Sequence, residues 1–482
     1  MKKYISTLCV LIALISVLSA CNKKTAEAEV TRYEIDLTLD MENMTVTASQ
    51  EVIYTNNTDT TLNEIVFHIY ANAFSKNSPI PVAERHYDNA YYNGESYGSI
   101  SIKHLEVEGK TCNYTEDNQL LRVPTLDLII GESVTISMTY EIIIPCVKHR
   151  FGYNDKSINL GNFYPQVAVY ESGSFRDDPY YGIGDPFYSE IAYYNVKVNA
   201  PSDYSVAGTG EAVHSTSNIK TKNIEYVAEN VRDFALILSD EYEFISANCG
   251  SVAINYYYYN DENAEDTLSV ACQAIELFSE LIGAYPYQTF NVAQAGFIYG
   301  GMEYPQLVFI SDELSVDNIG RVLVHEIAHQ WWYGIVGSDS INEAWVDEGL
   351  AEFMTLTFYD KIGDAETKDK LVDEAFNRYT AFQGVTYRLP EGITGEMQMS
   401  LSEYASEEHY ITMVYVKGLL MYNTLYEIMG EDIYKALRIY YEKCKYTNAS
   451  AEILIACFEK ANNMKVEKIF DAWINGYVVM VR

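Results

Sequence analysis

The sequence predicts an α+β protein in which a mostly antiparallel β domain is followed by an α/β domain with most of its mass in helices. Three observations support this. Apolar and polar residues alternate with period two in runs between residues 31 and 240, helical patterns fill most of the chain beyond Gln306, and no internal repeat or low-complexity linker interrupts either part. With 482 residues, 48% of them hydrophobic, the chain is long enough for two domains, each with its own core. We place the domains at residues 31–240 and 241–482.

The first 21 residues form a predicted targeting signal. Two lysines precede an almost wholly apolar run, Leu8 to Leu18, which is too short to span a bilayer comfortably. The ending Leu-Ser-Ala-Cys resembles the lipobox of bacterial lipoproteins, in which the chain is cut before the cysteine and lipidated on its sulfur. We therefore expect a lipid on Cys21, a tether over residues 22–30, and a protein anchored to the bacterial membrane on its extracytoplasmic side. The alternative is an ordinary signal peptide with a chance cysteine.

Composition excludes some partners. Acidic residues outnumber basic ones 68 to 33, which gives a formal net charge of −35. A field of that sign argues against nucleic acid as a partner and against electrostatic docking on anionic lipid. The 43 tyrosines suit both strand faces and polar rims, and we interpret this bias as mainly structural.

Cysteines offer no cluster for metal or redox chemistry, because none of them forms a C-x-x-C pair. An exported protein can form disulfides, but the sequence does not determine their pairing. Cys272, Cys444 and Cys457 lie in helical patterns, and we expect them to be buried free thiols.

The β domain is predicted from its alternation. Tyr33, Ile35, Leu37 and Leu39 alternate with polar residues, as in a half-buried strand. Turn clusters such as the one at residues 56–59 separate the runs. Further strands are predicted at residues 65–70, 134–144, 193–198 and 234–238.

In the second domain, strands at residues 252–259 and 291–295 flank a predicted helix at 264–282. This helix ends at Gly283 with Pro286 beyond, which are the usual stop signals. An apolar run follows at 307–310. Helices are then predicted at residues 318–334, 343–359, 364–382, 407–429, 431–445, 449–461 and 466–476.

The strongest chemical signal is H-E-x-x-H, which spans His325, Glu326 and His329, followed by Glu348 nineteen residues beyond the second histidine. Positions i and i+4 of a helix share a face, so both imidazoles can bind one ion. Glu348, on the next predicted helix, completes the three-ligand set of a catalytic zinc site and leaves a fourth position open. A lone histidine is more often structural, but this pair with its glutamates is hard to explain without a metal. We predict one Zn²⁺ per chain.

Glu326 lies one position around the helix from the metal ligands, which suits it to hold a water molecule beside the ion. Zinc lowers the pKa of its water, and Glu326 takes the proton as general base while the hydroxide attacks a carbonyl. The same carboxyl then returns the proton to the leaving amine. The predicted reaction is therefore peptide hydrolysis.

A family resemblance rests on two runs, HEIAHQWWYG at residues 325–334 and WVDEGLA at 345–351, with eighteen residues between His329 and Glu348. Together they resemble the aminopeptidase N family of zinc metallopeptidases, within the gluzincins. The resemblance implies a β saddle domain followed by a thermolysin-like catalytic domain. It also implies an activity that removes N-terminal residues from peptides with a free N-terminus.

A second motif agrees with this family. Residues 300–304, Gly-Gly-Met-Glu-Tyr, are similar to its G-x-M-E-N segment. The resemblance implies that the backbone at Gly301 and Met302 pairs with the substrate and that Glu303 binds the free α-amino group. A carboxylate at a fixed distance from zinc recognises an ammonium group and rejects blocked ends. Tyr304 departs from the usual Asn, so the local hydrogen bonding should differ.

A third motif begins at Tyr415, where Tyr-Val-Lys-Gly resembles the family's Y-x-K-G stretch. The resemblance implies that this tyrosine donates a hydrogen bond to the tetrahedral oxyanion, where negative charge develops in the reaction. Tyr410 is the reserve candidate for this role.

Two further residues are weaker candidates for the site, and a third is set aside. Gln166 falls where the family places a Gln or Glu that assists Glu303 with the amine. Glu343 matches an acidic position of the family and either orients a zinc-bound histidine or is an exposed charge at the start of a helix. His409 lacks a partner at a useful spacing and is expected on the surface.

The resemblance is tight over residues 285–352 and looser elsewhere, and residues 470–474 resemble the end of the family's catalytic domain. Large members continue into a helical domain that encloses the cleft, so we expect a more open site here, or one closed by a partner. Two rival functions remain: an endopeptidase of thermolysin type, which shares the zinc ligands, and a non-catalytic peptide-binding lipoprotein.

Overall fold

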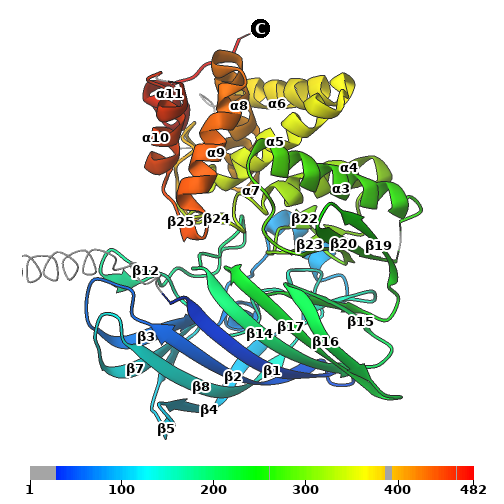
Figure 1. Ribbon diagram of the computed structural model, residues 1–482, viewed down its shortest axis with the longest axis vertical. Coiled ribbons are helices and arrows are strands. Elements are labelled where there is room, and N and C mark those ends of the chain that lie inside the picture. Colours follow the sequence, from blue (N-terminus) through cyan, green and yellow to red (C-terminus); the bar gives the residue numbers. More distant parts are fainter. Residues whose placement is uncertain (1–28, 260, 386–392, 463, 482) are drawn as a thin grey trace, which may run out of the picture.

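The computed structural model describes residues 29–259, 261–385, 393–462 and 464–481. The expected signal peptide, Cys21 and most of the tether lie outside these residues. The strand-rich N-terminal part lies beneath the helix-rich second part (Figure 1). This arrangement confirms the predicted α+β class. None of the described helices is both long enough and apolar enough to cross a bilayer.

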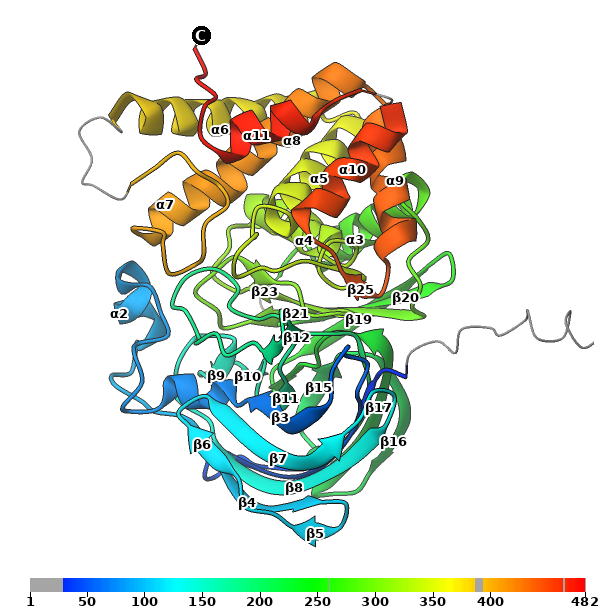
Figure 2. The same cartoon turned by 90° about the vertical axis from the view of Figure 1, so that its left-hand side faces the viewer.

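The largest sheet has eight strands in the order β16-β17-β14-β1-β2-β8-β4-β5, and all neighbours are antiparallel except the parallel pair β1 and β14. Its inner face is apolar because the alternation predicted from the sequence buries Tyr33, Ile35, Leu37 and Leu39. In Figure 2 the sheet curves around the smaller sheets. The strands are β1 (Thr31–Asp40), β2 (Thr45–Thr55), β4 (Ser99–Val107), β5 (Lys110–Thr111), β8 (Ser133–Ile143), β14 (Ala192–Pro201), β16 (Glu211–Ser217) and β17 (Thr221–Val231).

Three smaller sheets lie between the large sheet and the second part of the chain (Figure 2). One is β15-β18-β10-β9, from Ser205–Gly208, Leu236–Ser239, Ile158–Leu160 and Phe151–Tyr153. The second is β11-β3-β7-β6, from Gln166–Val167, Leu62–His68, Leu120–Leu128 and Thr115–Asp117. The third pairs β12 (Tyr170–Glu171) with β13 (Ser174–Phe175). Short helices at Tyr70–Phe74, Glu84–His86 and α2 (Tyr87–Ala90) follow β3.

A five-stranded sheet supports the helix-rich part, in the order β19-β20-β21-β23-β22. Strands β20, β21 and β23 are parallel, and α3 crosses over between the first two of them. The last strand, β22, pairs with β23 on one side only and so forms an edge of the sheet. The elements are β19 (Glu243–Cys249), β20 (Val252–Tyr258), α3 (Ala264–Leu281), β21 (Thr289–Ala295), β22 (Gly301–Met302) and β23 (Leu307–Ser311).

The remaining helices confirm most of the predicted ranges but not all of their ends. The metal helix α4 ends at Ala328, six residues before the predicted end, because the chain turns and reaches a φ of 137° at Tyr333. The predicted helix at 407–429 contains a π-helical turn, Thr412–Val416. The elements are α4 (Val316–Ala328), β24 (Val336–Gly337), α5 (Asp347–Ile362), α6 (Ala365–Val385), α7 (Glu407–Ile411), α8 (Lys417–Met429), α9 (Asp432–Cys444), β25 (Thr447–Asn448), α10 (Ala451–Asn462) and α11 (Glu467–Ile474).

One cysteine prediction is wrong. Cys272 is not a free thiol but forms a disulfide with Cys249, which joins α3 to the end of β19. The helical pattern around Cys272 shows that it faces the core, but it does not reveal which strand lies opposite. Cys444 and Cys457 are buried free thiols, as predicted.

Candidate active site

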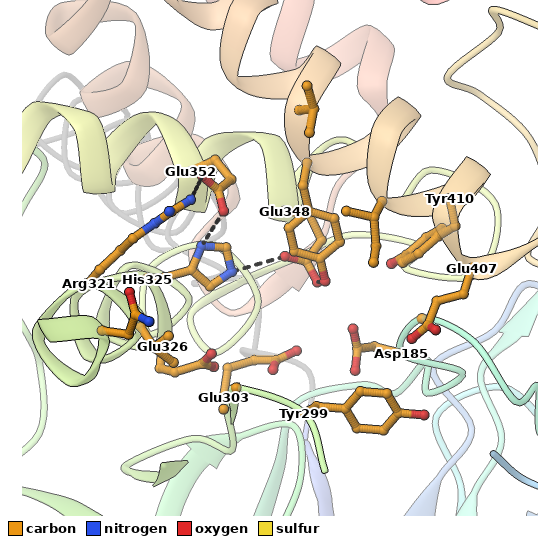
Figure 3. Close-up of a pocket in the computed structure, with 18 of the residues that line it drawn as sticks. Asp185, Tyr299, Glu303, Arg321, His325, Glu326, Glu348, Glu352, Glu407 and Tyr410 are labelled. Carbon is orange, nitrogen blue, oxygen red and sulfur yellow. Dashed lines mark hydrogen bonds and ion pairs between the residues drawn. The ribbon is translucent and has the colours of Figure 1, made fainter. Parts of the chain in front are cut away.

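A cavity of about 610 Å³ opens above the edge strand β22, between the helix-rich part and the β region. Figure 3 shows the side chains that converge in it. Helices α4 and α5 supply the predicted metal ligands, and the segment from Ile298 to Glu303 borders the cavity below them. Gly184, Asp185 and Arg150 come from the β region, whereas α6, α7, the π-helical turn and α8 supply much of the opposite wall.

The three predicted metal ligands meet at one point. The Nε2 atoms of His325 and His329 are 3.1 Å apart, and Oε2 of Glu348 lies 3.1 Å from the first and 3.2 Å from the second. Tetrahedral zinc with bonds of about 2.0 Å requires ligand atoms about 3.3 Å apart. Two neutral imidazoles and one carboxylate are also ligands that zinc prefers, so this donor set fits the metal.

A hydrogen bond orients the imidazole of His329, and an ion-pair contact lies beside that of His325. Nδ1 of His329 lies 2.9 Å from the backbone oxygen of Trp332 and donates its proton there, so that Nε2 keeps a lone pair for a metal. Nδ1 of His325 lies 3.5 Å from Oε1 of Glu352, one helical turn after Glu348 (Figure 3). Glu352 therefore stands where the outer partner of a zinc-bound histidine is expected.

Glu343, predicted as the possible outer partner of a zinc histidine, lies elsewhere. Its carboxylate accepts hydrogen bonds from the backbone N–H of Ala451, 3.0 Å away at the start of α10, and from Gln398. Negative charge at a helix start is favourable, which explains this position. Glu352 was missed, although its i+4 spacing from Glu348 is visible in the sequence.

The pKa values of Glu348 and Glu326 are shifted in opposite directions. Here the metal set means the three predicted ligands His325, His329 and Glu348. Burial raises the pKa of Glu348, but the two histidines more than offset burial and hold that pKa below its usual range. Burial raises the pKa of Glu326 to about 7. The Oε2 atom of Glu326 has no hydrogen-bond partner among the described residues, and Gly301 leaves no room for a Cβ beside the same carboxyl group. A free carboxylate oxygen therefore faces the space beside the metal set.

Two more carboxylates form the other end of the site. One oxygen each of Asp185, Glu303 and Glu348 lies within 4.8 Å of the others, and all three residues are buried. Burial raises the pKa of Glu303 well above its usual range and that of Asp185 to about 6. Arg150 forms an ion pair with Asp185 and donates a hydrogen bond to the backbone oxygen of Gly184. The arrangement is a recess lined by carboxyl groups next to the three metal ligands (Figure 3).

The residue that lies beside Glu303 is Asp185 and not Gln166, which the sequence suggested. Gln166 lies in β11, outside the lining of the cavity, and its Nε2 donates to the backbone oxygen of Arg232 at 2.9 Å. The prediction that Gln166 assists Glu303 is therefore corrected. Asp185 lies in an irregular Gly-Asp-Pro segment, and only the fold brings it to Glu303.

Both candidate tyrosines line the cavity. The hydroxyl of Tyr415 donates to Oε1 of Glu348 at 2.5 Å, and its ring stacks on His325. The hydroxyl of Tyr410 has no hydrogen-bond partner among the described residues. Tyr415 lies on the π-helical turn, a local change in helix pitch that is often found at functional sites.

His409 is not on the surface as expected. It is 3% exposed, its Nε2 lies 2.8 Å from the backbone oxygen of Thr394, and its ring stacks on Phe382. It is absent from the lining of the cavity, so its role is structural.

Comparison with known proteins agrees with this geometry. Residues 267–473 match the family model described as the Peptidase family M1 domain. Aminopeptidase N of Lactobacillus helveticus is 26% identical over 231 residues, which cover 44% of this chain and 27% of that protein. Aminopeptidase M1-D of Oryza sativa subsp. japonica is 24% identical over 318 residues, which cover 60% of this chain and 35% of that protein. The chain thus matches about a third or less of the length of these relatives.

Solved structures resemble the whole fold. The M1 zinc metallopeptidase of Deinococcus radiodurans superposes with a TM-score of 0.68 at 16% identity, over 94% of this chain and 95% of that one. A mutant of that protein bound to a Tyr-Ser-Ala substrate gives a TM-score of 0.66 over the same shares. Residues 267–473 are thus similar in sequence to the peptidase family M1 domain, the ligand set lies within this matched region, and the chain shares the two-part fold of the Deinococcus radiodurans protein.

Proposed function

We propose that the protein is a zinc aminopeptidase, which removes residues from the N-terminus of peptides. The observation that carries this proposal is the pair of buried carboxylates, Glu303 and Asp185, next to the metal-binding set. An ammonium group is the natural ligand of such a recess, because it relieves the repulsion between the carboxylates and donates charge-assisted hydrogen bonds to them. A peptide held there by its α-amino group has its first peptide bond close to the metal set.

His325, His329 and Glu348 would hold one Zn²⁺, which supplies Lewis acidity and lowers the pKa of a bound water. Glu326 accepts the proton of the attacking water and afterwards donates it to the leaving amine. Its raised pKa, about 7, suits both steps near neutral pH.

The chain's other polar groups hold the substrate. Strand β22 has one free edge, at Gly301 and Met302, to which the substrate backbone can add as a further strand. The hydroxyl of Tyr415, already aimed at Glu348, donates to the developing oxyanion. Tyr410 lies farther along the same wall and is the alternative donor.

Two variants and a blocked substrate test this proposal. Glu326→Gln should keep its zinc and lose turnover, whereas substantial remaining activity would contradict the role of Glu326 as base. A peptide with a free N-terminus should be cleaved far faster than its N-acetylated form, because acetylation removes the positive charge of the α-amino group. Efficient cleavage of the acetylated peptide would instead favour a thermolysin-type endopeptidase. Metal analysis should find one zinc per chain, and a protein without zinc would favour a non-catalytic peptide-binding lipoprotein.

We further propose that the protein is a lipoprotein anchored to the membrane on its extracytoplasmic side through Cys21. The support is the Leu-Ser-Ala-Cys ending of the apolar N-terminal run. The full chain expressed in a bacterial host should partition into detergent phase and carry lipid at Cys21. A Cys21→Ser chain that partitions in the same way would contradict the proposal.

A further inference from the structure

Glu303 lies in a segment that regular secondary structure hardly supports. Strand β22 contains only Gly301 and Met302, so sheet pairing ends immediately before the carboxylate. An aminopeptidase nevertheless needs Glu303 at a fixed distance from the metal, since a misplacement of about 1 Å in an active site costs up to about 100-fold in rate. Other contacts must therefore hold this segment.

On the metal side, the segment is bound by Gln330, the residue that follows the ligand His329. The Nε2 of Gln330 donates to the backbone oxygen of Tyr304 at 3.1 Å, and its Oε1 accepts from the backbone N–H of Gln306 at 2.8 Å. Gln330 is 1% exposed, so water does not compete for these bonds. One amide side chain thus connects the end of the metal helix to the residues directly after Glu303.

On the opposite side, Tyr304 connects the segment to the β region. Its hydroxyl donates to Oδ1 of Asn162 at 3.1 Å, and Nδ2 of Asn162 donates to Oδ2 of Asp233 at 2.6 Å. A Cβ on Gly161 would overlap the Tyr304 hydroxyl, and Asn162 has a φ of 52°, so the turn is shaped around this side chain. The side chains that form these hydrogen bonds, those of Tyr304, Asn162 and Asp233, are all buried.

We propose that Tyr304 and Gln330 are positioning residues that together fix Glu303 relative to the metal ligands. Tyr304 contributes nothing to the cavity lining, and a phenylalanine would fill its core position equally well if packing were its only role. Its hydroxyl acts by connecting the amine-binding segment to Asn162 and Asp233. This inference rests on the proposed aminopeptidase function and adds the means by which that site keeps its spacing.

The test compares two tyrosine variants of the zinc-loaded protein on a leucine chromogenic substrate with a free amine. Tyr304→Phe removes the hydroxyl that holds the segment. Tyr287→Phe is the matched control, because its hydroxyl also bridges the two parts of the chain, to the backbone oxygen of Asn230 at 2.8 Å, but touches nothing near Glu303. Asn162→Gly removes the same connection from the other end at a φ that glycine adopts freely.

Tyr304→Phe and Asn162→Gly should each raise KM about 5- to 10-fold with a smaller change in kcat and unchanged zinc content, because both lose the buried hydrogen bond between Tyr304 and Asn162. Tyr287→Phe should stay within about twofold of the wild type. Equal KM values for Tyr304→Phe, Asn162→Gly and the control would overturn the inference while leaving the aminopeptidase function intact. A wild-type protein that cleaves free and acetylated peptides equally would instead overturn the function itself, and the inference with it.

Discussion

The role of Asp185 gives the sharpest prediction, because the sequence suggested Gln166 in its place. Replacing Asp185 with Asn removes one of two charges that would meet the substrate ammonium and leaves the positive Arg150, its ion-pair partner, without compensation. A hydrogen bond to a charged group contributes about 1.5–3 kcal/mol. The variant should therefore lose about 10- to 100-fold in kcat/KM for peptides with a free N-terminus.

The loss should fall mainly on substrates that carry the ammonium. We expect the ratio of kcat/KM for free over N-acetylated peptide to drop by a similar factor, since an acetylated N-terminus never used the Asp185 charge. Steady-state kinetics on matched free and acetylated peptides measure both values, and zinc content checks that the metal set is intact.

Gln166→Met is the control for this experiment. It removes the polar end of a buried side chain that hydrogen-bonds the backbone oxygen of Arg232 and the Tyr194 hydroxyl, outside the cavity. Its kinetics should lie within about twofold of the wild type. The reasoning would be refuted by the reverse outcome, in which Gln166→Met loses discrimination and Asp185→Asn keeps it.

Three further predictions follow from the contacts around the site. Glu352→Gln should weaken zinc affinity about 10- to 100-fold in a zinc-buffer titration, whereas Glu343→Gln should leave it unchanged; equal affinities would remove Glu352 from the metal site. Tyr415→Phe should lower kcat more than it changes KM, and an unaffected kcat would transfer the oxyanion role to Tyr410 or to neither. Burial raises the pKa of Asp233 to about 7, far above its value of about 4 in the unfolded chain. Between these two pH values the folded protein holds a proton that the unfolded chain has released. The free energy of unfolding therefore falls by about 1.4 kcal/mol per pH unit as pH rises from about 4 to about 7. Denaturant melts should therefore show a free energy of unfolding that falls less steeply with pH in Asp233→Asn than in the wild type, and parallel curves would contradict this.

Local sequence patterns predicted the parts of the molecule that depend on local geometry. The i, i+4 spacing of His325 and His329 requires only a helix, and the alternation beginning at Tyr33 requires only a strand with one buried face. Both features therefore appear in the structure where the sequence indicated them.

Features set by contacts between distant segments could not be predicted in this way. Asp185 reaches Glu303 from an irregular loop 118 positions earlier, and Cys272 meets Cys249 only because α3 packs against β19. The structure replaces Gln166 with Asp185 for the same reason: a motif indicates the kind of partner that is needed, whereas the packing of the fold decides which side chain reaches it. Glu352, which lies beside His325 where Glu343 was expected, differs from Asp185, because its i+4 spacing from Glu348 is visible in the sequence although the prediction missed it.

The central claim, that peptides are cleaved one residue at a time from a recognised amino end, can be tested in one time course. A ten-residue peptide with a free N-terminus is incubated with the zinc-loaded protein, and the products are followed by mass spectrometry. The account predicts a ladder of peptides shortened from the N-terminus, together with free amino acids, and no products once the zinc is chelated. Internal fragments at early times, with the original N-terminus still present on one of them, would contradict it.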